Sequence, residues 1–282
     1  MSEEGDGDRG AVDLPAPGGV AAPREGGGRP AGDGLSLFEC VRRGKLAIPP
    51  AHRQQKRFFR FLRRASGDER FLDEVRRLRD EIVLDSVREG RGDRGTTLAL
   101  ASPRGGEGTS VLALTLGLAL GDCGMRKVAF LDGRLQAERF DVLSRWLELS
   151  RNAVSIPKGF SEIAGYCNER YENVYFLRNS IPERSMDFFS DKRLGSFIED
   201  LRGKFDFTVL DLPPLLSEAS GLFVLPYVDR LYLVVEAGRT RILEVDRCLE
   251  VARDAGCQVA GVVLNKQTAP WWSRFFWREF FY

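Results

Sequence analysis

The chain has 282 residues, a hydrophobic fraction of 43% and a formal net charge of +1, enough for one large α/β domain with appendages or two small domains. The acidic N-terminus has no apolar core and no run of about 18 apolar residues occurs, so we expect neither a secretory signal nor a membrane span. One histidine, His52, cannot build a metal site. The five cysteines are odd in number and lack C-x-x-C spacing, which argues against a zinc site or a disulfide framework and fits a reducing cytoplasm.

The N-terminal segment, residues 1–34, contains ten glycines and four prolines and almost no large apolar side chains. Such a segment cannot bury enough surface to offset the entropy of ordering it, so we expect it to be disordered. We predict a basic helical linker at residues 35–67 and a main domain at residues 68–266. An aromatic C-terminal tail, residues 267–282, completes the chain.

Positive charge is concentrated in residues 41–79, which hold thirteen Lys or Arg and four Asp or Glu. Three phenylalanines in this region are interleaved with arginines. A basic helix with aromatic residues could lie on an anionic membrane surface or contact an acidic partner. Nucleic acid is the least favoured of these partners. A solvated helix whose apolar side packs on the main domain explains the pattern equally well.

The first element expected in the main domain is a helix from about residue 68. Its apolar residues recur at helical spacing, at Phe71, Val75, Leu78 and Ile82. A second, charged row recurs every three residues, at Asp73, Arg76 and Arg79. A solvated face is the default interpretation of this row, and an interaction surface is the alternative.

Six apolar runs are predicted to be strands, at residues 96–101, 127–132, 173–177, 207–211, 230–235 and 259–265. Helices are expected at about 111–120, 190–203 and 241–256, and helical or mixed structure at roughly 137–170. Continuous apolar strands that alternate with helices are typical of a parallel sheet covered on both faces. The predicted fold class is therefore α/β, with a mostly parallel sheet and helices on both faces.

A glycine-rich turn, residues 102–110, connects the first strand to the next helix. Backbone N–H groups in such a turn face an anion, so it predicts a nucleotide site formed by Arg104, Gly105, Gly106, Glu107, Gly108, Thr109 and Ser110. Ser110 stands where the Ser or Thr of a P-loop holds Mg²⁺. Two later strands end in Asp132 and Asp211, which would join the turn at one edge of the sheet as metal ligands. Capping of a following helix is the structural alternative for each aspartate.

These motifs, in this order, resemble those of the bacterial capsule and exopolysaccharide tyrosine kinases, a deviant-Walker P-loop group related to the ParA and MinD ATPases. The resemblance extends from about Phe71 to Lys266. It implies a P-loop NTPase-like fold, ATP and Mg²⁺ as cofactors, and catalytic roles for Asp132 and Asp211. Residues 73–79 are similar to the family's self-association helix, residues 102–110 to its Walker A motif and residues 130–135 to its second acidic motif. Residues 205–214 are similar to its Walker B motif, and residues 226–229 and 261–266 to two later motifs.

Three departures from the family pattern concern the chemistry. Thr109 replaces the P-loop lysine that neutralises the β- and γ-phosphates in phosphoryl transfer. Arg134 replaces the second aspartate of the second acidic motif. The tail has eight aromatic residues in residues 271–282 but only one tyrosine, Tyr282, as a candidate phosphoacceptor. Arg104 stands where a MinD-type loop has its signature lysine, and it or Arg134 could restore charge for binding.

The resemblance and its departures together predict a degenerate homologue that acts as a cytoplasmic regulator or scaffold in polysaccharide assembly, at the inner face of the membrane. The family implies a membrane-anchored chain-length regulator or co-polymerase as partner. It also implies self-association, for which Asp73, Arg76 and Arg79 are candidates, or assembly with an active homologue. The alternatives are an active tyrosine autokinase and a ParA/MinD-like positioning ATPase. The tail could dock on a partner, enter a membrane interface or fold back on its own domain.

Overall fold

The computed structural model describes residues 60, 64–65, 67–90, 94–124, 126–133, 137–152, 163–168, 171–179 and 190–267. The chain divides into two units, Met1–Gly34 and Leu35–Tyr282, and all described residues belong to the second. Most of the basic linker and all but one residue of the aromatic tail lie outside the described residues. The predicted domain boundaries therefore stay predictions.

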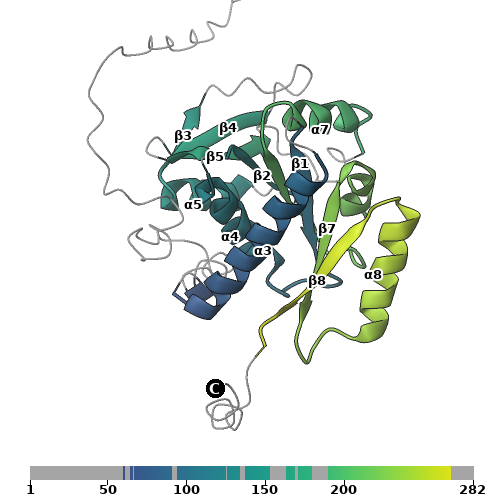
Figure 1. Ribbon diagram of the computed structural model, residues 1–282. Coiled ribbons are helices and arrows are strands. Elements are labelled where there is room, and N and C mark those ends of the chain that lie inside the picture. The colour runs from purple at the N-terminus through teal and green to yellow at the C-terminus, as the bar shows by residue number, and fades with distance from the viewer. Residues whose placement is uncertain are drawn as a thin grey trace, which may run out of the picture. The chain divides into compact units, whose positions relative to one another are not determined.

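An eight-stranded sheet forms the centre of the described domain, in the order β3-β4-β5-β2-β6-β1-β7-β8 (Figure 1). Six neighbouring strands, from β5 to β8 in that order, are parallel. The strands are β1 (Thr96–Ala101), β2 (Val128–Asp132), β3 (Leu149–Asn152), β4 (Ile163–Asn168), β5 (Tyr171–Asn179), β6 (Phe207–Asp211), β7 (Arg230–Glu236) and β8 (Val259–Asn265). This arrangement confirms the predicted fold class, and it places β1 between β6 and β7.

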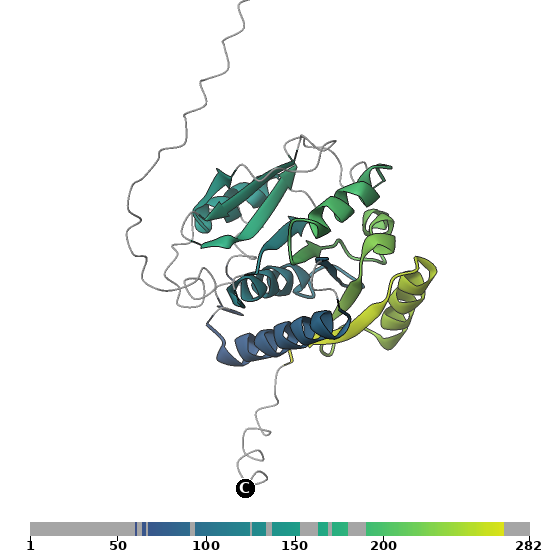
Figure 2. The same cartoon turned by 45° about the horizontal axis from the view of Figure 1, so that its top comes forward.

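Helices cover both faces of the sheet (Figures 1 and 2). One face packs against α3 (Glu69–Arg88), α4 (Thr109–Asp122) and α5 (Ala137–Trp146). The other packs against α7 (Leu194–Arg202), α8 (Ile242–Asp254) and the short 3₁₀ helices η1 (Ala219–Phe223) and η2 (Leu225–Tyr227). Alternate residues of one strand enter different cores, because side chains alternate across a sheet. In β1, Leu98 and Leu100 face the α4 side, and Ala99 and Ala101 face the α7 side.

Helix α3 begins where the sequence predicts it. The Asp68 carboxylate accepts hydrogen bonds from the backbone N–H groups of Arg70 and Phe71, at 3.1 and 3.3 Å, and so caps the helix. Leu72, Val75 and Ile82 are buried, so one side of the helix packs on the domain. Figure 2 shows α3 and α4 lying side by side on the same side of the sheet.

Helix α4 is the central helix of the domain, and it is buried along nearly its whole length. It follows the glycine-rich turn directly, because β1 ends at Ala101 and α4 begins at Thr109. Its packing against β1, β2, β5 and β6 fixes its N-terminus at the carboxyl edge of the parallel strands. The turn is therefore held between two buried elements.

The region at residues 137–170 contains two strands that the sequence analysis assigned to helical or mixed structure. Helix α5 occupies only Ala137–Trp146, after which β3 and β4 form antiparallel pairs that extend the sheet beyond β5. Strand β3 has no continuous apolar run, and the short apolar run of β4 is interrupted by Gly165. Pairing with β5 defines them, and a short sequence window does not contain that information.

Candidate functional site

The glycine-rich turn lies at the carboxyl edge of β1 and leads into α4. Gly106 and Gly108 have φ values of +94° and +96°, which side chains other than glycine rarely adopt. Gly108 is the N-cap of α4 and offers no side chain to its first N–H groups. The helix N-terminus thus keeps backbone donors for an anion.

Thr109 is the first residue of α4, and its side chain lies inside the protein. The residue is 7% exposed, and its hydroxyl Oγ1 has no hydrogen-bond partner within the described residues. A buried hydroxyl without a partner costs free energy. This hydroxyl could donate to a phosphate oxygen bound at the helix N-terminus, but it carries no positive charge.

Asp132 and Asp211 are brought together next to the turn. They occupy paired positions at the ends of β2 and β6, and Asp211 is also paired with Leu100 of β1. Asp211 is buried, and Asp132 is half-buried. After β6 the chain returns to the turn, where the Leu215 N–H donates to Ser102 O at 2.9 Å. The predicted convergence of both carboxylates and the turn at one edge is therefore present, whereas their catalytic and metal-binding roles stay predictions.

The candidate protein ligands for magnesium at this site are oxygen donors. Within the described ranges, no group of three or more His, Cys, Asp or Glu residues could hold a metal ion. Mg²⁺ in nucleotide sites is commonly bound through one or two carboxylates, waters and the phosphates themselves. Ser110, Asp132 and Asp211 fit this mode, because they are oxygen donors at the same edge of the sheet.

Glu107 ties the turn to the loop that follows β7. Its buried carboxylate accepts a hydrogen bond from the Arg104 backbone N–H at 3.0 Å and another from the Thr240 hydroxyl. The Asn265 side chain donates to Glu107 O at 2.8 Å, from the end of β8. The loops after β7 and β8 thus hold the turn on the side opposite to Asp211.

Arg104 forms an ion pair with Glu244 in the first turn of α8. From the sequence, this arginine could replace the charge of the missing loop lysine, but in the structure its guanidinium faces Glu244 of α8. The pKa of the Glu244 carboxyl lies below its usual value, chiefly because the Arg241 backbone N–H donates to it and also because of the Arg104 charge. Arg134, the other proposed replacement, lies outside the described residues.

Lys266 is a cation that the sequence analysis noted only as part of a motif. Its Nζ donates to Gly106 O at 2.5 Å and to Glu236 Oε2 at 2.9 Å. Arg239 also bonds Glu236, at 3.0 Å. The hydrogen bond from Lys266, with a smaller contribution from Arg239, holds the pKa of the Glu236 carboxyl below its usual value. The position of Lys266 after the last parallel strand is the sequence signal that could have drawn attention to it.

The charged row on α3 is separate from this site. Arg76 Nη1 lies 2.7 Å from Asp73 Oδ1, and Arg79 pairs with Asp80 at 2.8 Å. The structure thus joins two of the three predicted self-association residues in one ion pair, and self-association itself stays a prediction. Tyr282, the candidate phosphoacceptor, lies outside the described residues.

In the described part of the chain, no helix is both long enough and apolar enough to cross a bilayer.

Comparisons with known proteins agree with the fold. No family profile matches the chain. An uncharacterized ATP-binding protein of Methanocaldococcus jannaschii, MJ0169, is 27% identical over 172 residues, which span 60% of this chain and 64% of that protein. The tyrosine-protein kinase CpsD of Streptococcus pneumoniae serotype 4 is 22% identical over 177 residues, which cover 62% of this chain and 78% of CpsD.

Solved kinase domains share the same architecture. The BceF tyrosine kinase domain superposes with a TM-score of 0.56 at 17% identity and covers 80% of this chain and 96% of that domain. The kinase domain of the Escherichia coli tyrosine kinase ETK gives a TM-score of 0.53 at 17% identity and covers 71% of this chain and 78% of that domain. At these identities the likeness concerns the fold alone.

The sheet order, the glycine-rich turn and the strand-end carboxylates define a P-loop nucleotide-binding fold. Within that class, the chain is similar in sequence to bacterial proteins named as tyrosine-protein kinases, such as CpsD of Streptococcus and ptk of Acinetobacter johnsonii.

Proposed function

We propose that this chain binds a nucleotide but does not transfer its phosphate, and that it acts as a regulator or scaffold in capsule or exopolysaccharide assembly. Thr109 carries the proposal. It occupies the loop position of the family's lysine, and its side chain is a buried, neutral hydroxyl. The positive φ glycines and the N-terminus of α4 favour phosphate binding, and these features do not depend on that lysine.

Binding and catalysis place different demands on this site. Phosphoryl transfer requires positive charge placed accurately against the phosphates, because catalysis here is almost entirely positioning and electrostatic stabilisation. Bound Mg²⁺ would supply part of that charge, with Ser110, Asp132 and Asp211 as its protein ligands. Thr109 contributes a hydrogen-bond donor without charge, and Arg104 is engaged by Glu244. The arrangement therefore supports phosphate binding better than phosphate transfer.

Calorimetry with Mg-ATP tests the proposal on the wild type and on Thr109→Lys. We expect the wild type to bind, and the lysine variant to bind more tightly. Absence of binding by the wild type would overturn the nucleotide-binding part, whether or not the lysine restores it. In a second experiment the wild-type protein is incubated with Mg-ATP, and mass spectrometry identifies any phosphorylated tyrosine.

Phosphate on Tyr282 or another tyrosine would replace the proposal by an active autokinase. Nucleotide-dependent dimerisation with ATP hydrolysis, but without phosphotyrosine, would replace it by a positioning ATPase. We expect neither result, because both activities normally rely on the loop lysine.

The proposed cellular location and partner rest on the resemblance to the kinase family and on the basic residues 41–79. The partner is a membrane-anchored chain-length regulator or co-polymerase, reached by a cytoplasmic protein at the inner face of the membrane, as a homo-oligomer or together with an active homologue. Residues 41–79, with thirteen basic and four acidic side chains, favour contact with an anionic surface. The full chain should co-sediment with vesicles that contain anionic lipid, and less so as the salt concentration rises. Co-sedimentation that does not depend on the salt concentration, or no co-sedimentation, would contradict the proposed contact with an anionic membrane.

A further inference from the structure

Strand β8 ends next to the glycine-rich turn, and the residue that follows it has an unusual backbone. Lys266 has a φ of +56°, one of two positive values among the described residues other than glycine. A lysine rarely adopts this left-handed conformation, so packing or hydrogen bonds must maintain it. Here the Lys266 N–H donates to the Asn265 side-chain oxygen at 2.8 Å, while the other end of that amide bonds Glu107 O.

This backbone conformation accompanies a contact between the lysine side chain and the turn. The Lys266 ammonium donates to the carbonyl oxygen of Gly106, two residues before the α4 N-cap. Its second acceptor is Glu236. An ammonium has three N–H donors, so these two bonds leave one for a further acceptor.

The charges around the turn mean that an added cation would strengthen anion binding. Glu107 places a buried carboxylate within the turn itself, bonded to the Arg104 backbone N–H. The Arg104 guanidinium is paired with Glu244. A phosphate that enters the turn thus approaches a carboxylate that accepts two hydrogen bonds but forms no ion pair among the described residues, and Thr109 adds no charge.

Glu236 can remain paired when Lys266 turns toward a ligand. Arg239 bonds the same Glu236 oxygen, at 3.0 Å, and two cations therefore share one carboxylate. Arg239 Nη1 also lies 3.5 Å from the position that a Cβ on Gly106 would occupy. The group carries a net charge of about +1 next to the turn, and its lysine is already in contact with the turn.

We propose that Lys266 supplies the positive charge that the turn lacks at Thr109, and that it binds the phosphate groups of a nucleoside di- or triphosphate. The cation would come from the end of β8, two strands away from β1 in the sheet, instead of from the loop itself. This inference rests on the proposed nucleotide binding and adds a residue to it. Lys266 is a binding residue here, and no phosphate transfer is assigned to it.

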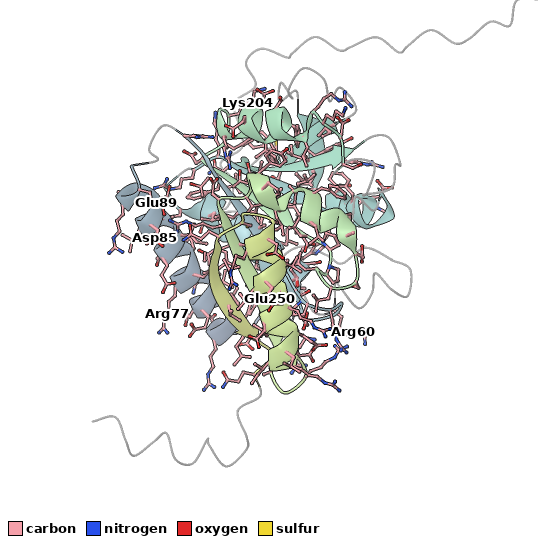
Figure 3. The ribbon with its side chains drawn as sticks, turned by 90° about the vertical axis from the view of Figure 1, so that its right-hand side faces the viewer. Arg60, Arg77, Asp85, Glu89, Lys204 and Glu250 are labelled. Atoms are coloured by element: carbon pink, nitrogen blue, oxygen red, sulfur yellow. The ribbon has the colours of Figure 1, made fainter. Side chains whose placement is uncertain are left out.

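Calorimetry with Mg-ATP and Mg-ADP on Lys266→Gln tests the inference. Charge-assisted hydrogen bonds are about twice as strong as neutral ones, so we expect affinity to fall roughly 10- to 100-fold. Lys266→Arg should recover part of the loss. Lys204→Gln makes the same charge change just beyond α7 (Figure 3), before β6 begins and so at the edge of the sheet opposite to the turn, and it should leave affinity unchanged. Unchanged binding by Lys266→Gln would overturn the inference while nucleotide binding stands.

A double variant separates a charge role from a structural one. If Lys266 supplies charge, Thr109→Lys should restore nucleotide affinity in the Lys266→Gln background. If Lys266 only holds the turn in shape, the new lysine should fail to restore affinity, whatever the change in melting temperature. That second pattern would overturn the inference. A wild type that binds no nucleotide would overturn both this inference and the proposed function.

Discussion

Arg230, the first residue of β7, donates a hydrogen bond from Nη1 to Oδ2 of Asp85 on α3 at 2.9 Å. Its Nη2 also bonds Glu89, the C-cap residue of α3, four residues further along the chain. Arg230 is only 7% exposed on its side chain, while both carboxylates are about half-buried. Asp85 and Glu89 lie near the same end of α3 in Figure 3. One buried guanidinium thus joins the C-terminal part of α3 to the sheet.

Replacement of Arg230 by Met should lower the free energy of unfolding by about 1–3 kcal/mol, because it leaves two carboxylates without their buried partner. Urea unfolding followed by circular dichroism measures this. Arg77→Met is the matched control, since Arg77 pairs with Glu74 on the exposed side of the same helix and both side chains are over 70% exposed. The control should change stability by less than about 0.5 kcal/mol. Equal effects of the two variants would contradict the role assigned to Arg230.

The parallel part of the fold could be predicted from the sequence because its strands are continuous apolar runs. Leu98 and Ala99 both had to be apolar, since each faces a different core. The antiparallel pair was not predictable in this way. Strand β3 has the sequence Leu-Ser-Arg-Asn, and only its pairing with β4 makes it a strand. Strand formation there depends on residues far away in the chain.

The site, too, could be predicted from the sequence only in part. Asp132 and Asp211 could be placed beside the turn, because the carboxyl ends of parallel strands meet at one edge. The partners of the turn could not be predicted, because they depend on β7 lying next to β1 and β8 next to β7. Sequence spacing gives no sign that Glu244 takes up the Arg104 guanidinium, 140 residues away in the chain.

Gly108→Ala should destabilise the domain and weaken nucleotide binding. A Cβ at this position would lie 2.2 Å from Asn265 Nδ2, which must then move away from Glu107 O. Gly90→Ala is the matched control: Gly90 also has a positive φ, but a Cβ there has no atom within 4 Å. Both variants incur backbone strain of about 1 kcal/mol, so the difference between their melting curves isolates the contact with Asn265. If Gly108→Ala and Gly90→Ala lost stability and affinity equally, the contact with Asn265 would have no measurable role.

Asp211→Asn should reduce the magnesium dependence of nucleotide binding. The amide has the same size as the carboxylate but lacks its charge, and Mg²⁺ prefers charged oxygen ligands. Calorimetry with ATP, in the presence of magnesium and of chelator, gives the ratio of the two affinities. We expect this ratio to be large in the wild type and smaller in the variant, because Ser110 and Asp132 remain. Asp254→Asn, at the end of α8, is the control and should retain the wild-type ratio.

The pH dependence of stability should reveal the Glu236 cluster. Its bond from Lys266, and then that from Arg239, lowers the pKa of Glu236 in the folded protein below the ordinary value of 4.5. The resulting stabilisation is present above pH 4.5 and is lost as the pH falls through the lowered folded-state pKa. Glu236→Gln should therefore be less stable than the wild type at pH 7, and the difference should shrink below pH 4.5.

Urea unfolding at pH 7, 5 and 3.5 follows this difference. Glu250→Gln, on the exposed side of α8 (Figure 3), provides the control and should differ little from the wild type at any of these values. A difference between Glu236→Gln and the wild type that stays constant with pH would show that the ion pairs contribute nothing to stability.

The buried thiols of Cys248 and Cys257 should resist labelling while the protein is folded. Burial raises the pKa of Cys248 to about 12, with a further contribution from the negative charges of Glu107 and Glu244. Burial likewise raises the pKa of Cys257 to about 11. At pH 8, about one in ten thousand Cys248 side chains would be a thiolate, the reactive form. Cys123, which is half-buried and lies just after α4, should react faster.

Iodoacetamide labelling at pH 8, followed by peptide mapping, measures each site separately. Cys123 should be labelled in the folded protein, whereas Cys248 and Cys257 should be labelled only after urea is added. Because Cys248 lies on the buried side of α8, its labelling also reports whether α8 stays packed on the sheet. Rapid native labelling of Cys248 would mean that α8 detaches readily, and the Arg104–Glu244 pair would then be too transient to hold Arg104 away from a ligand.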